Sequence, residues 1–241
     1  MCTWRLSSKD ALRIAVLMDY IQTEHHKTFI MVTLTTPNVK GEDLKNEITR
    51  FNESFKKLCK RDEILKINHG YIRKLEVTYN EKRNDYNPHF HVLFAVNPSY
   101  FTDRTYIKQS RWLDLWQQAT GDNTITQVDV RRIKKGTEAN EMSKYFGKYD
   151  DFLHSQEVFD TFYQSLKGRQ LLTYNSLFAQ ANKKYKNKEL EHYKTKDDTE
   201  YIYLILYHWY GSEYAKKRVR EITQFEYKEL KKEAIDEMPI T

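Results

Sequence analysis

The stretch Pro88-His89-Phe90-His91-Val92-Leu93-Phe94 constrains the fold more than any other part of the sequence. Apolar residues flank and separate two histidines, a pattern typical of a β-strand, in which successive side chains point to opposite faces. His89 and His91 would then share one face, about 6.5–7 Å apart along the strand. That spacing suits two imidazoles that bind one metal ion, but it fits equally a strand with two incidental histidines. The other face would be apolar and would pack against helices; it carries Phe90, Val92, Phe94 and Val96.

Hydrophobic periodicity elsewhere predicts a mixed α+β chain with hairpins in its middle and no internal repeat. Helices are expected over residues 9–25, 41–60, 107–119, 137–149, 154–167, 176–185 and 223–237. Strands are expected over residues 28–36, 71–79, 88–96, 124–133 and 169–174. Residues 80–87 are expected to form a long polar hairpin loop, and the apolar run 201–209 fits a strand or a helix.

Glu76 is an ionisable residue inside a β-branched segment, on the strand expected to pair with the histidine strand. Its burial would be costly unless it is paired or binds a cation. A carboxylate beside two imidazoles is a mixed nitrogen and oxygen ligand set, suited to Mn²⁺ or Mg²⁺ with open positions, or to Zn²⁺. The alternative is a surface ion pair of Glu76 with Lys74 or with an arginine.

Glu141, Tyr145 and Tyr149 are spaced four residues apart, so a helix would place them on one stripe. A phenol is a poor nucleophile at its ordinary pKa near 10, but it can attack a phosphodiester whose charge a metal ion screens. Glu141 could accept a proton from the phenol or from water. Lys144 and Lys148 could hold the phosphate. The alternative is an amphipathic helix with surface pairs.

Charge and aromatic content fit a polyanionic partner. The net charge is +6 and 14% of the residues are aromatic, and basic side chains neutralise phosphates while aromatic rings stack on unpaired bases. Each basic cluster taken alone also fits a solvated helix face. The candidate DNA-binding residues are Arg131, Arg132, Lys134, Lys135, Lys183 and Lys184, with a further cluster at Lys216, Lys217, Arg218 and Arg220.

Several classes of protein are disfavoured by composition. The two cysteines, Cys2 and Cys59, exclude a disulfide framework and suggest a reducing compartment. No apolar run reaches the length of a membrane span, and the N-terminus has no secretory signal pattern. We therefore expect a cytoplasmic protein that does not contact a membrane.

Three motifs in order along the chain resemble those of one family. His89-Phe90-His91 is an HUH signature, two histidines around a hydrophobic residue. Thr33-Leu34-Thr35-Thr36-Pro37-Asn38 resembles the first motif of rolling-circle replication initiators, and Glu141-Met142-Ser143-Lys144-Tyr145 resembles their tyrosine motif. From about Lys9 to at least Tyr185, the chain resembles the replication initiators of small rolling-circle plasmids of Gram-positive bacteria, of the single-tyrosine type with a catalytic glutamate.

The resemblance implies an α+β HUH endonuclease with a ferredoxin-like or RRM-like palm, whose central antiparallel sheet carries the histidine strand. Glu76, His89 and His91 would hold one Mn²⁺ or Mg²⁺ ion. Tyr145 would nick one strand of the origin and keep a 5′-phosphotyrosine link, and Glu141 would activate water at termination. Tyr149 is an alternative nucleophile.

The resemblance also implies a nicking domain over residues 1–185, with residues 186–241 as a mixed α/β extension packed on it. The expected partners are plasmid origin DNA and the host helicase and polymerase, and the chain would act as a monomer or a dimer. Two alternatives remain: a relaxase or transposase on the same core, and a non-catalytic origin-binding or copy-control protein. Longer relatives carry a cysteine-rich segment upstream, of which Cys2 resembles a remnant.

Overall fold

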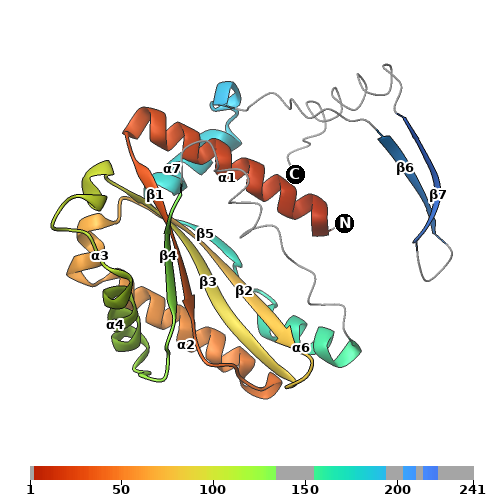
Figure 1. Cartoon of the computed structure of the whole chain (residues 1–241), viewed down its shortest axis with the longest axis horizontal. Helices are drawn as coiled ribbons and strands as arrows, with labels where there is room; N and C mark the ends of the chain where they lie inside the picture. The colour runs from red at the N-terminus through yellow and green to blue at the C-terminus, as the bar shows by residue number, and fades with distance from the viewer. Residues whose placement is uncertain (1–2, 134–154, 194–202, 210–213, 222–241) are drawn as a thin grey trace. The chain divides into compact units, whose positions relative to one another are not determined.

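The computed structural model describes residues 3–133, 155–193, 203–209 and 214–221 (Figure 1). The chain divides into two compact units, Met1–Tyr193 and Lys194–Thr241. The second unit contains a two-stranded antiparallel ribbon of β6 (Tyr203–Trp209) and β7 (Tyr214–Glu221). Of the apolar run 201–209, the described residues 203–209 therefore form a strand rather than a helix. The expected division near residue 185, and the packing of the extension on the first unit, stay predictions.

A five-stranded antiparallel sheet forms the centre of the first unit, with strand order β4-β1-β3-β2-β5. Its strands are β1 (Thr28–Thr35), β2 (Tyr71–Asn80), β3 (Asp85–Val96), β4 (Val128–Arg132) and β5 (Leu172–Tyr174). The histidines lie on β3, the middle strand. The predicted α+β class, with a central antiparallel sheet that carries the His-x-His strand, is confirmed.

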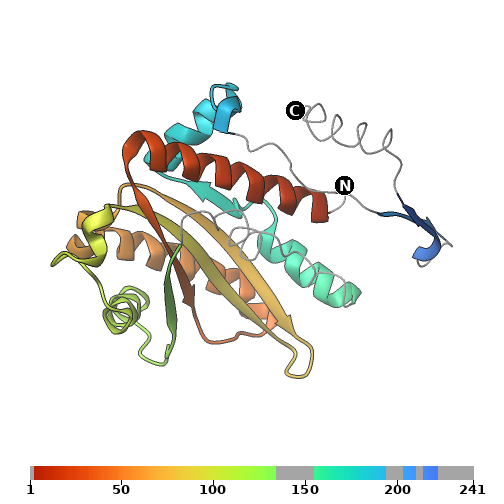
Figure 2. The same ribbon diagram turned by 45° about the horizontal axis from the view of Figure 1, so that its top comes forward.

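Helices cover both faces of this sheet, as Figures 1 and 2 show from two sides. One face packs on α2 (Gly41–Cys59), α3 (Asp62–Ile67), α4 (Gln109–Thr120) and α6 (Gln156–Leu166). The other packs on α1 (Thr3–His25) and α7 (Leu177–Lys186). Two short 3₁₀ segments, Pro98–Phe101 and Glu191–Tyr193, complete the described part of the unit. Among the described helices, none has the length and apolar character to cross a bilayer.

The alternation along β3 determines which face holds the histidines. Phe90, Val92, Phe94 and Val96 belong to the core under α2 and α4, as the sequence predicted. The opposite side of the same strand carries His89 and His91, followed by Leu93 and Ala95 in the core under α1 and α7. The second core therefore fills only one end of this face, and the histidines occupy the other end.

Replacing Phe90 by alanine is expected to lower the free energy of unfolding by about 3–5 kcal/mol. Its side chain is fully buried and stacks on Phe51 with 4.2 Å between ring centroids, and the Arg73 guanidinium lies 4.4 Å from its centroid. Urea denaturation measures the change. Leu65→Ala serves as control, because Leu65 is 57% exposed and its loss should cost less than about 0.5 kcal/mol. Equal costs for both variants would contradict this view of the core.

The local predictions for the β2–β3 hairpin loop and for β4 were wrong, and one short helix was missed. The hairpin loop is shorter than the predicted 80–87, because β2 continues to Asn80 and β3 starts at Asp85. Tyr79 faces Tyr86 across this extended hairpin, with ring centroids 5.0 Å apart, which explains why polar residues still pair. β4 covers only Val128–Arg132 of the predicted 124–133, and the short α3 was not predicted.

Candidate metal centre

Glu76, His89 and His91 converge on the sheet face whose other end packs on α1 and α7. Glu76 lies opposite His89 in the β2–β3 pairing. Its Oε2 atom is 2.9 Å from His91 Nε2 and 3.3 Å from His89 Nε2. One ligand atom from each of the three residues lies within 4.8 Å of the others. The sequence-predicted trio is therefore brought together, in a geometry that could hold one metal ion.

The hydrogen bond of His89 Nδ1 determines which nitrogen of the ring is free to bind a cation: Nε2, the one that lies near Glu76. His89 Nδ1 lies 3.2 Å from the Asn87 carbonyl oxygen, which can only accept a hydrogen bond. This contact assigns the proton of a neutral ring to Nδ1 and leaves the Nε2 lone pair directed at the Glu76 carboxylate. Two acceptors at 3.3 Å need a cation between them, either a proton or a metal ion. The donor set and its orientation thus fit a divalent metal.

Threonine from the neighbouring strand supports the other imidazole. Thr33 on β1 lies opposite His91, and its hydroxyl is 3.2 Å from His91 Nδ1. Asn87 also donates to the Thr36 carbonyl oxygen at 3.0 Å and to Asn38 Oδ1 at 2.9 Å. The segment Thr33–Asn38 therefore holds His91 directly and His89 through Asn87. These supporting roles were not predicted, although the segment had been singled out as a motif.

The two histidines and the neighbouring Lys74 keep Glu76 ionised. Burial alone would raise the pKa of Glu76, but its hydrogen bonds with His89 and His91 and the charge of Lys74 outweigh burial and lower it well below its usual range. Lys74 is only 2% exposed, so it is not the partner in a surface pair. Burial lowers the pKa of Lys74, opposed by the charges of Glu76 and Asp10.

The trio forms part of the lining of a cleft of about 1180 Å³. The opposite wall is formed by Gln109 and Ser110, at the start of α4, and by residues 126–129 before and within β4. Gln109 donates to the Val128 carbonyl oxygen at 2.7 Å, which ties the helix to the strand. A cleft of this size, with a partly buried carboxylate and two imidazoles at one side, can admit a substrate much larger than a metal ion.

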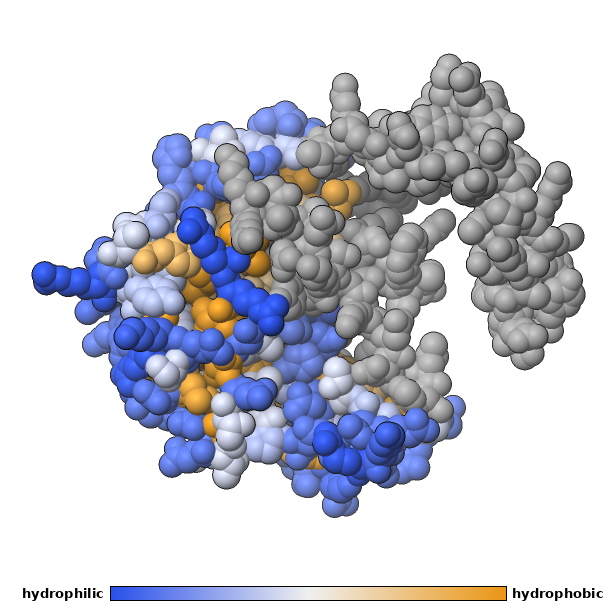
Figure 3. Space-filling view, in the orientation of Figure 1, coloured by the Kyte–Doolittle hydropathy of each residue, from blue (hydrophilic) through white to orange (hydrophobic). Residues whose placement is uncertain are grey.

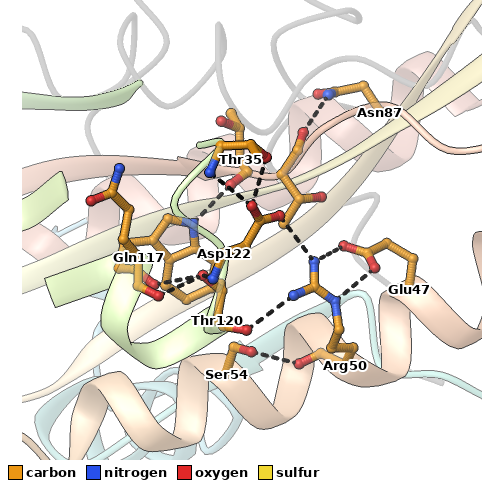
Figure 4. A network of polar contacts seen from close by, with 11 residues as sticks. Thr35, Glu47, Arg50, Ser54, Asn87, Gln117, Thr120 and Asp122 are labelled. Carbon is orange, nitrogen blue, oxygen red and sulfur yellow. Dashed lines mark hydrogen bonds and ion pairs between the residues drawn. The ribbon is translucent and has the colours of Figure 1, made fainter. Parts of the chain in front are cut away.

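A polar network holds α4 in place against β1 and α2 (Figure 4). Trp116 Nε1 donates to the Thr35 carbonyl oxygen at 2.7 Å. Arg50 of α2 donates to the Thr120 carbonyl oxygen at 3.1 Å and pairs with both carboxylate oxygens of Glu47. The wall of the cleft is therefore fixed to the same strand that carries Thr33.

The remaining predicted residues fall into two groups. Arg131 borders the cleft and pairs with Asp129 at 2.6 Å, whereas Arg132 lies over the Phe101 ring. Lys183 and Lys184 lie on α7, where Lys184 pairs with Glu189 at 2.8 Å. Outside the described residues lie Glu141, Lys144, Tyr145, Lys148, Tyr149, Lys134 and Lys135, so their roles stay predictions.

Replacing Thr33 by valine is expected to weaken Mn²⁺ binding about 10–100-fold, the usual effect of losing a partner that orients a metal-binding histidine. Valine removes the hydroxyl beside His91 Nδ1 and keeps the side-chain volume. Isothermal titration with Mn²⁺ measures the change. Thr33→Ser keeps the hydroxyl and should bind almost as the parent does; a similar loss in both variants would point to strand packing instead.

Lowering the pH below 6.5 is expected to weaken Mn²⁺ binding. Burial lowers the pKa of His91 from its usual 6.5, against the raising effect of the Glu76 hydrogen bond. The imidazole must be neutral to bind metal, so affinity should hold at pH 6.5 and fall as the pH drops through the lowered pKa of His91. The neutral ring likewise stabilises the fold above 6.5, and that contribution is lost on acidification. Titrations with Mn²⁺ between pH 7.5 and 5 show at which pH the affinity begins to fall. A loss of affinity that begins above pH 7 would contradict the prediction.

Comparison with known proteins agrees with the motifs. Residues 1–229 match the Rep_1 family model, which is described as Replication protein. The chain is 55% identical over 156 residues to Protein rep of Staphylococcus aureus, covering 64% of this chain and 68% of that protein. It is 32% identical over 209 residues to Protein rep of Bacillus amyloliquefaciens, covering 76% and 61% respectively.

Protein rep of Streptococcus pneumoniae is 32% identical over 200 residues, covering 79% of this chain and 62% of that protein. The matches thus span about two thirds or less of these three relatives. No solved structure matches the chain. The family match covers nearly the whole sequence, and the chain therefore belongs to the Rep_1 family of replication proteins.

Proposed function

We propose that this protein initiates rolling-circle replication of a plasmid by nicking one strand of the origin DNA. The observation that carries the proposal is the convergence of Glu76, His89 and His91 on one side of a large cleft, in a chain of the replication protein family. Two imidazoles and a carboxylate leave coordination positions for a substrate oxygen. In the proposed site a bound Mn²⁺ or Mg²⁺ would polarise the scissile phosphate and screen its charge.

Tyr145 is the proposed nucleophile. Its hydroxyl oxygen forms a bond to phosphorus, and the bond from phosphorus to the 3′ oxygen of the preceding nucleotide breaks. Glu141 accepts the phenol proton, and the departing 3′ oxygen takes a proton from solvent water to become the free 3′-OH that primes synthesis. The products are a 5′-phosphotyrosine link and an unblocked 3′ end. In this proposal Glu141 activates water when replication terminates.

The residues around the trio supply positioning. Thr33 and Asn87 fix the two imidazoles through their outer nitrogens. Lys74, which is buried beside Glu76 on the same strand, adds positive charge, and the two imidazoles hold the carboxylate in one place. Preorganised ligands of this kind reduce the reorganisation needed when a phosphodiester binds.

A covalent adduct is the direct test. Labelled single-stranded oligonucleotides that tile the plasmid origin are incubated with the protein and Mn²⁺, and the products are separated on a denaturing gel. We expect the downstream fragment to be linked to the protein through its 5′ phosphate, the upstream fragment to be released with a free 3′-OH, and no product to form with EDTA. Origin binding without an adduct under these conditions would favour a non-catalytic origin-binding protein and overturn the proposal.

A further inference from the structure

A second cavity lies at the other end of β1 from the metal centre. It has a volume of about 370 Å³ and forms between the end of α1, the start of β1 and the end of β4. Three of its lining residues are basic or can become so, His26, Lys27 and Arg132, and no carboxylate lines it among the described residues. We call this cavity the β1-start pocket.

Arg132 carries a charge that the described residues do not neutralise. Its guanidinium lies 4.4 Å from the centroid of the Phe101 ring, and no ion pair or hydrogen bond of this side chain occurs in the part of the chain that is described. The neighbouring Arg131, in contrast, pairs with Asp129 at 2.6 Å. A guanidinium over an aromatic ring keeps its N–H donors at the edge, where they remain able to bind an anion.

Lys27 adds a second cation with a neutral partner. Its Nζ atom donates to Asn97 Oδ1 at 2.7 Å, an amide oxygen that positions the ammonium without cancelling its charge. The charge of Lys27 also contributes to lowering the pKa of His69, after burial as the main cause. His26, the residue before it, has a φ of 51°, a left-handed conformation that costs a non-glycine residue free energy. Within the described residues, Arg132 and Lys27 are thus two cations beside one pocket without a carboxylate partner, and the strained residue His26 precedes Lys27.

The β1-start pocket and the metal cleft border the same two strands. Thr33 and Asp129 line the cleft, and Phe29 and Ile133 line the pocket. Phe29 is four residues from Thr33, and Ile133 is four residues from Asp129. At the usual rise of 3.3 Å per residue, each pair is about 13 Å apart along its segment. Arg131 at the cleft is followed directly by Arg132 at the pocket, on the edge strand β4. In Figure 3, strongly hydrophilic side chains lie across an apolar band on the face that carries β4.

We propose that the β1-start pocket binds backbone phosphates of the DNA strand that extends from the nicking cleft along β4. The ligand class is a phosphodiester chain, since the pocket offers charge and N–H donors but no group placed to distinguish one base from another. The distance of about 13 Å spans a few nucleotides, given an axial spacing of about 3.4 Å per phosphate in duplex DNA and a longer one in an extended strand. This inference depends on the proposed function in one respect: the proposed function identifies the bound strand as origin DNA.

Binding measurements test the pocket without requiring cleavage. Fluorescence anisotropy compares single-stranded oligonucleotides that cover only the nick site with oligonucleotides extended on the 5′ or the 3′ side. We expect the parent to bind one extended oligonucleotide more tightly than the short one. Lys27→Gln with Arg132→Gln should abolish this advantage and leave the short oligonucleotide unaffected. The slope of log affinity against log salt should fall by about 1.4 for the extended oligonucleotide, since single strands lose about 0.7 per phosphate contact.

A charge-matched control distinguishes phosphate binding at the β1-start pocket from non-specific attraction of DNA to positive charge. Lys56→Gln with Lys57→Gln removes two exposed charges from α2, which covers the other face of the sheet, and should preserve the advantage of the extended oligonucleotide. Arg132→Lys should retain most of it, which also guards against misfolding of the glutamine variants. Equal losses in the control, or equal affinities of the parent for short and extended oligonucleotides, would overturn the proposal. Absence of nicking with these binding differences intact would instead count against the proposed function alone.

Discussion

Replacing His91 by alanine is expected to lower Mn²⁺ affinity more than about 100-fold and to remove DNA cleavage with it. The effect should exceed the 10–100-fold typical of an orienting partner, because the His91 Nε2 atom, 2.9 Å from the Glu76 carboxylate, would itself be a metal ligand. Its loss leaves His89 and Glu76, which are too few to hold a divalent ion against water. The imidazole is 10% exposed, so the variant also leaves a gap that only water can fill.

Isothermal titration and thermal unfolding measure the two consequences. Mn²⁺ at 100 times its dissociation constant should stabilise the parent by about 2.7 kcal/mol and should not stabilise the His91→Ala variant. His192→Ala is the matched control, because that exposed histidine lies in the 3₁₀ segment Glu191–Tyr193. Retention of the metal-induced stabilisation by His91→Ala would show that the ion binds elsewhere in the chain.

The sequence predicted those features of the site that depend on residues within one strand or one hairpin. Alternation along 88–96 predicted both the shared face of the histidines and an apolar face that packs on helices, which the structure identifies as α2 and α4. The position of Glu76 could also be predicted, because one hairpin joins its strand to the histidine strand. In each case the interacting residues are close in sequence, so strand periodicity is enough.

The supporting contacts could not be predicted, because they depend on pairing between distant segments. Thr33 and His91 are 58 residues apart, and only the β1–β3 register brings the hydroxyl to the ring. The burial of Lys74 likewise depends on α1 covering the sheet, since Asp10 of that helix acts on its charge. The charged pocket at the start of β1 joins residues from α1, β1 and β4, and none of these segments is distinctive by itself.

Replacing Tyr145 by phenylalanine is expected to abolish the covalent DNA adduct completely while DNA binding and Mn²⁺ affinity stay within about twofold of the parent. The substitution removes only the hydroxyl oxygen, which is the atom proposed to form the bond to phosphorus. The metal trio lies on β2 and β3 and keeps all its contacts. Catalysis should therefore be lost without loss of binding, in contrast to His91→Ala, which should lose metal affinity as well.

Tyr149→Phe is the matched control, because Tyr149 follows one helical turn later in the expected stripe and differs from Tyr145 only in position. Adduct formation on the labelled origin oligonucleotide, followed on denaturing gels over time, distinguishes the two. We expect Tyr149→Phe to form adduct at a rate close to that of the parent. If Tyr145→Phe retains the adduct and Tyr149→Phe loses it, then Tyr149 is the nucleophile; if both retain it, attack comes from a residue outside this stripe.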